Sequence, residues 1–161
     1  MVAILGLLAA VVVPRYVSLQ AGQDSRDFMS ALLRIGSDAR LIAIESGQAV
    51  QVTYDDSQRA VVFQTIDPDT FALSESKVIP VPGSIQLSSF TADGAFATAG
   101  DWQIAFYPDG SGLDGGIEVE DGAYVYNIVY RGVDGTSQKQ DGPLEESSGR
   151  DWQAGELEQR I

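Results

Sequence analysis

The stretch 107–116 holds the residues best suited to binding an ion. It contains Asp109 and Asp114 among four glycines, and oxygen-rich loops of this kind bind Ca²⁺. Two carboxylates are too few for an EF-hand, whose closing glutamate is missing, and a phosphate-binding loop would need a lysine and a following helix. The pattern therefore favours a wide turn between two strands. We expect no cofactor, with Ca²⁺ at Asp109 and Asp114 as the one candidate.

Paired carboxylates are a second candidate for chemistry, because glycosidases use such pairs as acid and base. The chain offers Asp55 with Asp56, and Glu118 with Glu120 and Asp121. An acidic protein contains such pairs by composition alone, and these fall on predicted turns or on an exposed strand face. We therefore expect no enzymatic activity. An enzyme or sugar-binding module on a membrane stalk remains the alternative class.

Aromatic residues and the missing residue types narrow the function further. Trp102, Tyr107 and the tyrosines of 124–130 could stack on sugars or bases, but aromatic residues that alternate along strands favour a core. The chain has neither cysteine nor histidine. Disulfides, thiol nucleophiles, Cys/His zinc sites and Ser-His-Asp triads are therefore excluded.

The charge of the chain disfavours nucleic acid as a partner. The formal net charge is −13 at pH 7, and residues 47–133 hold three basic side chains against twelve carboxylates. Residues 1–46 are balanced. Such a body repels phosphate backbones. Two interpretations stay open, a solubilising surface and a surface that steers a basic partner.

The first thirteen residues are apolar apart from Gly6, and Pro14 follows them. As a helix they would span about 20 Å, whereas a bilayer core is about 30 Å thick, so the segment is roughly seven residues short of a span. We expect a membrane anchor whose native start lies upstream of Met1. A signal peptide cleaved after Ala10 is the alternative, although no lysine or arginine precedes the apolar run.

Helical periodicity extends from Asp27 to Glu45. Apolar residues recur at a spacing of three and four along this stretch, at Phe28, Leu32, Ile35, Ala39 and Ile42. We predict one interrupted helix over 1–45 that is kinked at Pro14 and stopped by Gly47. A break near Gly22–Asp24, with Asp24 or Ser25 as the N-cap, is the alternative.

After Gly47 the period changes to two, and six Asp-Gly steps in the second half predict tight turns. The best-defined hairpin is predicted around Asp121 and Gly122. It pairs Glu120 with Ala123, Val119 with Tyr124 and Ile117 with Tyr126. This register places the following residues on one face: Ile117, Val119, Tyr124, Tyr126, Ile128 and Tyr130. Glu118 and Glu120 fall on the other face.

These patterns predict an α+β fold in which a long N-terminal helix packs on antiparallel sheets. The predicted helix covers 1–46, with the apolar segment at 1–13. The β head covers 47–133. Residues 134–161 are acidic and rich in Gly, Ser and Gln, which predicts a mobile, disordered tail.

The run from Ile4 to Tyr16, ILGLLAAVVVPRY, resembles the N-terminal helix of type IV pilins and type II secretion pseudopilins. The head resembles the GspH/FimT-like minor pseudopilins at residues 37–48, and at IAFYPDGS from Ile104 followed by GGIEV from Gly115. The likeness covers 4–130. Two features of the family are missing from this sequence, the Gly-Phe processing site and the glutamate that follows it.

The resemblance implies a minor pseudopilin, a structural subunit of a type II secretion pseudopilus with a single pass in the bacterial inner membrane and a periplasmic head. It places Met1 about eight residues into a mature helix that begins with N-methylated Phe, which gives about 21 residues for the span. Its partners would be other pilin or pseudopilin subunits and the inner membrane, with secreted cargo as a further candidate. The alternative is a DNA-uptake minor pilin of a type IV pilus. The residues expected to pack in the membrane and filament are Met1, Val2, Ile4, Leu5, Leu7, Leu8, Val11, Val12, Val13 and Pro14.

Overall fold

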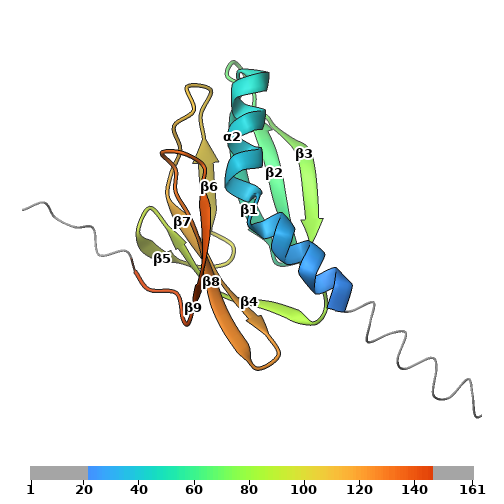
Figure 1. The fold of residues 1–161 in the computed structure, drawn as a ribbon. Coiled ribbons are helices and arrows are strands. Elements are labelled where there is room, and N and C mark those ends of the chain that lie inside the picture. Colours follow the sequence, from blue (N-terminus) through green and yellow to red (C-terminus); the bar gives the residue numbers. More distant parts are fainter. Residues whose placement is uncertain (1–21, 147–161) are drawn as a thin grey trace, which may run out of the picture.

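The computed structural model describes residues 22–146. In this part of the chain a helical segment packs against two antiparallel sheets, so the predicted α+β class is confirmed for the described residues (Figure 1). The elements that follow the first helical turns are α2 (Ile35–Ser46), β1 (Ala49–Asp55), β2 (Ala60–Ile66), β3 (Leu73–Pro80), β4 (Ile85–Ala92), β5 (Ala95–Ala97), β6 (Gln103–Phe106), β7 (Gly115–Asp121), β8 (Tyr124–Tyr130) and β9 (Ser137–Asp141).

The helical segment bends at Leu33 and Arg34. Residues 22–32 are helical, these two residues form a turn, and α2 then continues in a different direction (Figure 1). The N–H of Arg34 bonds to the carbonyl of Ala31 at 3.0 Å, three residues back, which tightens the turn. The predicted N-cap at Asp24 or Ser25 is wrong because residues 22–25 are helical. The expected kink at Pro14 lies outside the described residues.

The end of the helix agrees with the sequence. Gly47 has φ 68°, and its N–H bonds to the carbonyl of Ala43 at 3.0 Å, so the helix stops in the left-handed conformation that glycine adopts readily. The apolar stripe is buried at Phe28, Leu32 and Ile35 and continues through Ala39 and Ala43. Helix α2 packs against β1, β6 and β9 and so touches both sheets.

One sheet has the strand order β3-β2-β1-β6 and the other has β5-β4-β7-β8-β9. Their inner faces share one core with the helix. A row of aromatic rings crosses this core: the centroids of Tyr54 and Phe90 are 5.4 Å apart, those of Phe90 and Trp102 5.6 Å, and those of Trp102 and Tyr130 6.5 Å. Aromatic pairs at these distances attract one another in addition to burying area.

The hairpin of β7 and β8 forms where it was predicted, but its register differs. Asp121 pairs with Tyr124 and Val119 pairs with Tyr126, so the predicted pairing of Val119 with Tyr124 is wrong. The two turn residues are Gly122 and Ala123, because Gly122, with φ 63°, occupies the position that needs positive φ. A shift of two residues leaves the two faces unchanged.

The predicted mobile tail is wrong for the residues that follow the head directly. Ser137–Asp141 form β9, which pairs with β8 along its whole length. Composition hid this strand, because SQKQD has no apolar residue and most of its side chains face solvent. Residues 147–161 of the predicted tail lie outside the described residues.

Candidate functional site

The residues predicted to pack in a membrane or filament lie outside the described residues: Met1, Val2, Ile4, Leu5, Leu7, Leu8, Val11, Val12, Val13 and Pro14. The structure describes the segment that leads from them into the head. No helix within residues 22–146 is both long enough and apolar enough to cross a membrane. The candidate site that can be built from described residues therefore lies at residues 22–33, which we call the root of the helix, and at the strand ends beside them.

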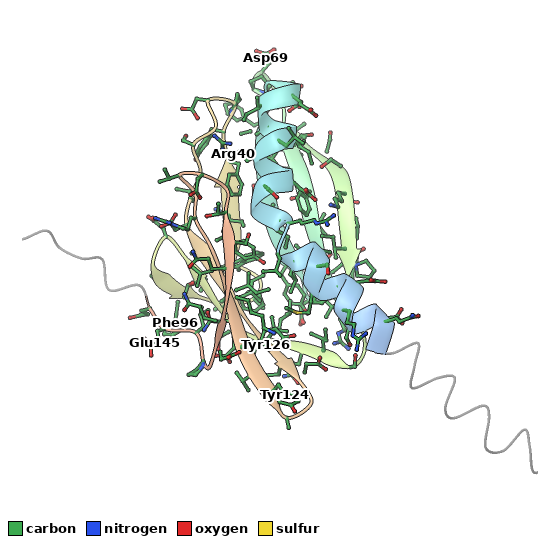
Figure 2. All side chains as sticks on the ribbon, viewed as in Figure 1. Arg40, Asp69, Phe96, Tyr124, Tyr126 and Glu145 are labelled. Atoms are coloured by element: carbon green, nitrogen blue, oxygen red, sulfur yellow. The ribbon has the colours of Figure 1, made fainter. Side chains whose placement is uncertain are left out.

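A groove of about 1140 Å³ lies between residues 22–33 and the tip of the β7–β8 hairpin, next to β9. The helix is fixed to the sheet beside it, since the hydroxyl of Tyr126 donates to Sδ of Met29 at 2.8 Å. Tyr124, at the tip, is 77% exposed and lies at the end of the molecule opposite Asp69 (Figure 2). The groove is somewhat larger than the roughly 300–1,000 Å³ of small-molecule pockets.

Charges of both signs line this groove. Arg26 comes from the helix, whereas Asp121, Lys139 and Asp141 come from the strands. The ammonium of Lys139 lies 4.0 Å from the ring centroid of Tyr126. Burial, and then the charge of Asp121, raise the pKa of Tyr126 to about 12, so its hydroxyl stays protonated as a donor at neutral pH. The groove can recognise polar and charged groups.

The two candidate calcium ligands, Asp109 and Asp114, form hydrogen bonds to different parts of the chain. The carboxylate of Asp109 accepts hydrogen bonds from the N–H of Ser111 at 2.9 Å and from its hydroxyl at 2.6 Å, and these bonds lower the pKa of Asp109. Asp114 accepts the N–H of Gly132 at 2.6 Å. Within residues 22–146 no three acidic side chains gather in an arrangement that could hold a metal ion. Calcium at this loop stays a prediction.

Arg40 joins this loop to the helix. Its Nε donates to the carbonyl of Gly110 at 2.8 Å, and Figure 2 shows the side chain on α2. Gly110 has φ 84°, a conformation that favours glycine. The loop carries the residues of the Tyr-Pro-Asp-Gly motif, so that motif has a structural role: it holds the end of β6 against α2.

The first carboxylate pair caps a turn. Asp55 accepts the hydroxyl of Ser57 at 2.6 Å, its N–H at 2.9 Å, and the N–H of Gln58 at 3.1 Å. The Ser57 hydroxyl is the main reason why the pKa of Asp55 is lowered. A catalytic acid needs a raised pKa, so this geometry does not support acid catalysis.

The second carboxylate group contains a residue that the sequence placed wrongly. Glu118 was expected on an exposed face, but it is only 9% exposed. Its carboxylate accepts the hydroxyl of Ser88 at 2.6 Å, that of Ser89 at 3.4 Å and the N–H of Leu144 at 2.7 Å. The Ser88 bond is the largest cause of its lowered pKa.

Asn127 lies opposite Glu118 on β8 and holds the same segment. Its Nδ2 donates to the carbonyls of Gly142 and Pro143, at 3.2 and 3.1 Å. We call residues 142–146 the strap. The strap covers the outer face of the five-stranded sheet and buries Leu144 there. The sequence offered one signal for this contact. Pro143 and Leu144 are isolated in a polar stretch, and Glu118 and Asn127 are polar residues between apolar neighbours in two strands.

The predicted aromatic platform is not assembled. Trp102, Tyr126 and Tyr130 are buried in the core, and Nε1 of Trp102 donates to the carbonyl of Thr91 at 3.0 Å. Tyr107, which directly follows β6, and Tyr124, at the start of β8, are exposed. The interpretation of the alternating aromatic residues as core is confirmed for these three.

Comparison with known proteins agrees with this architecture. The family model described as type II transport protein GspH matches residues 37–134. The minor pseudopilin EpsH from the type 2 secretion system of Vibrio cholerae superposes with a TM-score of 0.55 at 13% identity, covering 77% of this chain and 97% of that chain. A crystal structure of the minor pseudopilin EpsH from the same species gives 0.49 at 16% identity, covering 76% and 94%. No curated protein matches the chain.

Proposed function

This chain belongs to the GspH family of type II transport proteins, and we propose that it is a minor pseudopilin, a structural subunit of a type II secretion pseudopilus. The observation that carries the proposal is the family match over residues 37–134, which spans most of the head and α2. The likeness of fold to EpsH, a minor pseudopilin, supports it.

The subunit works by packing and not by catalysis. We propose that the apolar residues 1–13 anchor it in the inner membrane and bundle with the helices of other pseudopilin subunits. An apolar helix that leaves lipid needs neighbouring helices to bury it again. The helical residues 22–32 lead from this segment into the core, where Phe28 and Leu32 are buried. The head then moves with the helix as one body in the periplasm.

The charge argues against the alternative, a minor pilin that binds DNA. Residues 47–133 contain only Arg59, Lys77 and Arg131 as cations against twelve carboxylates. Two of these cations are engaged: Arg59 donates to the carbonyl of Ile85 at 2.8 Å, and Lys77 pairs with Asp38 at 2.6 Å. DNA binding depends on free cations that neutralise phosphates.

The test is a secretion assay in the bacterium that carries the gene. Deletion of the gene should leave the exported proteins in the periplasm, and the full chain should restore them to the medium. A chain that lacks residues 1–13 should not restore secretion. DNA uptake measured in the same strains is the control: secretion that survives the deletion while uptake fails would replace this proposal with the DNA-uptake function.

A further inference from the structure

Phe71 combines an unfavourable backbone with an exposed aromatic side chain. Among residues 22–146 three non-glycine residues have positive φ: Arg59, Phe71 and Asp93. Asp93 lies in an Asp-Gly turn, and Arg59 gains a hydrogen bond to Ile85. Phe71 has φ 56° and its side chain is 78% exposed, so burial of the ring does not offset the strain.

Hydrogen bonds within the loop hold the backbone at Phe71. The carboxylate of Asp67 accepts the N–H groups of Asp69 and Thr70, both at 2.9 Å. The carbonyl of Asp67 accepts the N–H of Phe71 at 2.9 Å, and its N–H donates to the carbonyl of Ala72 at 3.0 Å. A backbone that is already ordered loses little freedom on binding, which favours an anchor at this position.

Other exposed apolar side chains lie at the same end of the molecule. Leu73 pairs with Ile66 on β2, and Ile66 pairs with Ala49 at the start of β1, just beyond the end of α2. Ile44 is in the last turn of α2, and Tyr107 follows Phe106, which pairs with Val50. The loop at Asp69 marks this end in Figure 2. We call Ile44, Phe71, Leu73 and Tyr107 the distal surface, and all four are exposed.

Negative charge surrounds the distal surface. The nearby carboxylates belong to Glu45, Asp67, Asp69, Glu75 and Asp109. The closest cations along the same elements are both engaged within the head, since Arg40 donates to the carbonyl of Gly110, in the loop that carries Tyr107, and Lys77 pairs with Asp38. An apolar anchor inside an acidic rim complements an apolar pocket with a basic rim.

We propose that Phe71 anchors a docking surface at the distal end of the head, and that its partner is another pseudopilin subunit with an apolar pocket rimmed by Lys or Arg. The class of partner rests on the proposed function. The surface is separate from the helix packing already described, because it takes only Ile44, in the last turn of α2, from the helix, and residues 22–32 lie at the opposite end (Figure 1). The backbone strain at Phe71 is retained because the ring is needed outside the fold.

The experiment measures binding of the full chain, in detergent, to each of the other pseudopilin subunits of the same bacterium. Phe71→Gly removes the ring and relieves the strain, so this variant should unfold at a temperature no lower than the wild type and yet bind at least tenfold more weakly. Phe96→Ala is the matched control, since Phe96 is also exposed, at 54%, but lies on β5. Asp69→Asn should slow association at low salt, whereas Asp24→Asn, near the root of the helix, should not.

Binding that Phe71→Gly weakens and Phe96→Ala preserves supports the proposal. Equal binding by the wild type and Phe71→Gly overturns it and leaves the proposed function intact. Self-association of the chain that depends on Phe71 also overturns it, because the occupant would then be a second copy. If the wild type binds no pseudopilin at all, the proposed function fails together with this surface.

Discussion

Glu118 is a buried carboxylate whose hydrogen-bond donors are two hydroxyls and one backbone N–H. Its pKa in the folded protein is lowered, chiefly by Ser88. A lowered folded pKa stabilises the protein above the unfolded value of about 4.3, and this stability is lost as the pH falls through the folded pKa.

Glu118→Gln should therefore cost about 1–3 kcal/mol in the free energy of unfolding at pH 7, because charge-assisted bonds to Ser88 and Leu144 are lost. The deficit relative to the wild type should shrink as the pH falls below about 4. Urea unfolding at a series of pH values measures both effects. Glu120→Gln removes the same charge two residues along β7 and serves as the control. A deficit that is unchanged at the lowest pH would contradict the assignment.

Leu144 is the apolar contact of the strap. It is buried against Gly116, where an added Cβ would lie 2.8 Å from its Cδ1. Leu144→Ala should cost about 2–3 kcal/mol of stability, at the lower end for a buried leucine because the strap can settle toward the sheet. Val133→Ala, at a side chain that is 80% exposed, should change stability by less than about 0.5 kcal/mol. Equal effects of the two changes in urea unfolding would show that the strap is not packed.

At the scale of elements, α2 approaches the β8–β9 connection closely at Gly36. A Cβ added there would lie 2.5 Å from the carbonyl oxygen of Gly135, which is backbone and cannot move aside cheaply. Gly36→Ala should therefore destabilise the fold by about 1–3 kcal/mol, despite the gain in helix propensity. Gly22→Ala is the matched change, since nothing lies within 4 Å of that Cβ. In thermal unfolding, Gly22→Ala should have an unfolding temperature equal to or above that of the wild type. A change of the same sign in the unfolding temperature of both variants would refute the close approach.

The helix, most strands and the paired faces could be predicted because they depend on local periodicity. The stripe from Phe28 to Ala39 and the alternation in β7 and β8 are visible without tertiary context. The hairpin register was missed by two residues because an Asp-Gly step fixes the presence of a turn but not which residue takes the central position. Gly122 took the first central position.

The remaining errors have a common physical origin in long-range contacts. The strand β9 has no apolar pattern of its own, and its stability comes from hydrogen bonds to β8. The burial of Glu118 depends on Leu144, 26 residues away. The bend at Leu33 and Arg34 interrupts the helix, and a stripe of constant period does not reveal it. At the candidate site, the loop at Asp109 was predicted to be a turn. The groove beside residues 22–33 could not be predicted, because its walls come from distant parts of the sequence.

At the scale of the whole molecule, the described head is an acidic body rigidly joined to a helix. The inner faces of both sheets and the helix share one core, so a force on residues 22–32 is transmitted to the strands. Both ends of the described head carry exposed residues. The groove lies at the end near residues 22–33, and the distal surface lies at the opposite end. The proposed docking surface and the proposed packing of the N-terminal segment would place neighbouring subunits at both ends, as in a filament.

The most direct measurement uses the lack of cysteine in the chain. Leu41→Cys, at an exposed position on the outer side of α2, and Tyr124→Cys, at the hairpin tip, supply single thiols for cross-linking in intact cells. The account predicts cross-linked species that join this chain to another pseudopilin subunit, identified by mass spectrometry, in cells that still secrete. Recovery of both variants only as monomers, in cells whose secretion is intact, would contradict the central claim that the protein is a subunit of the pseudopilus.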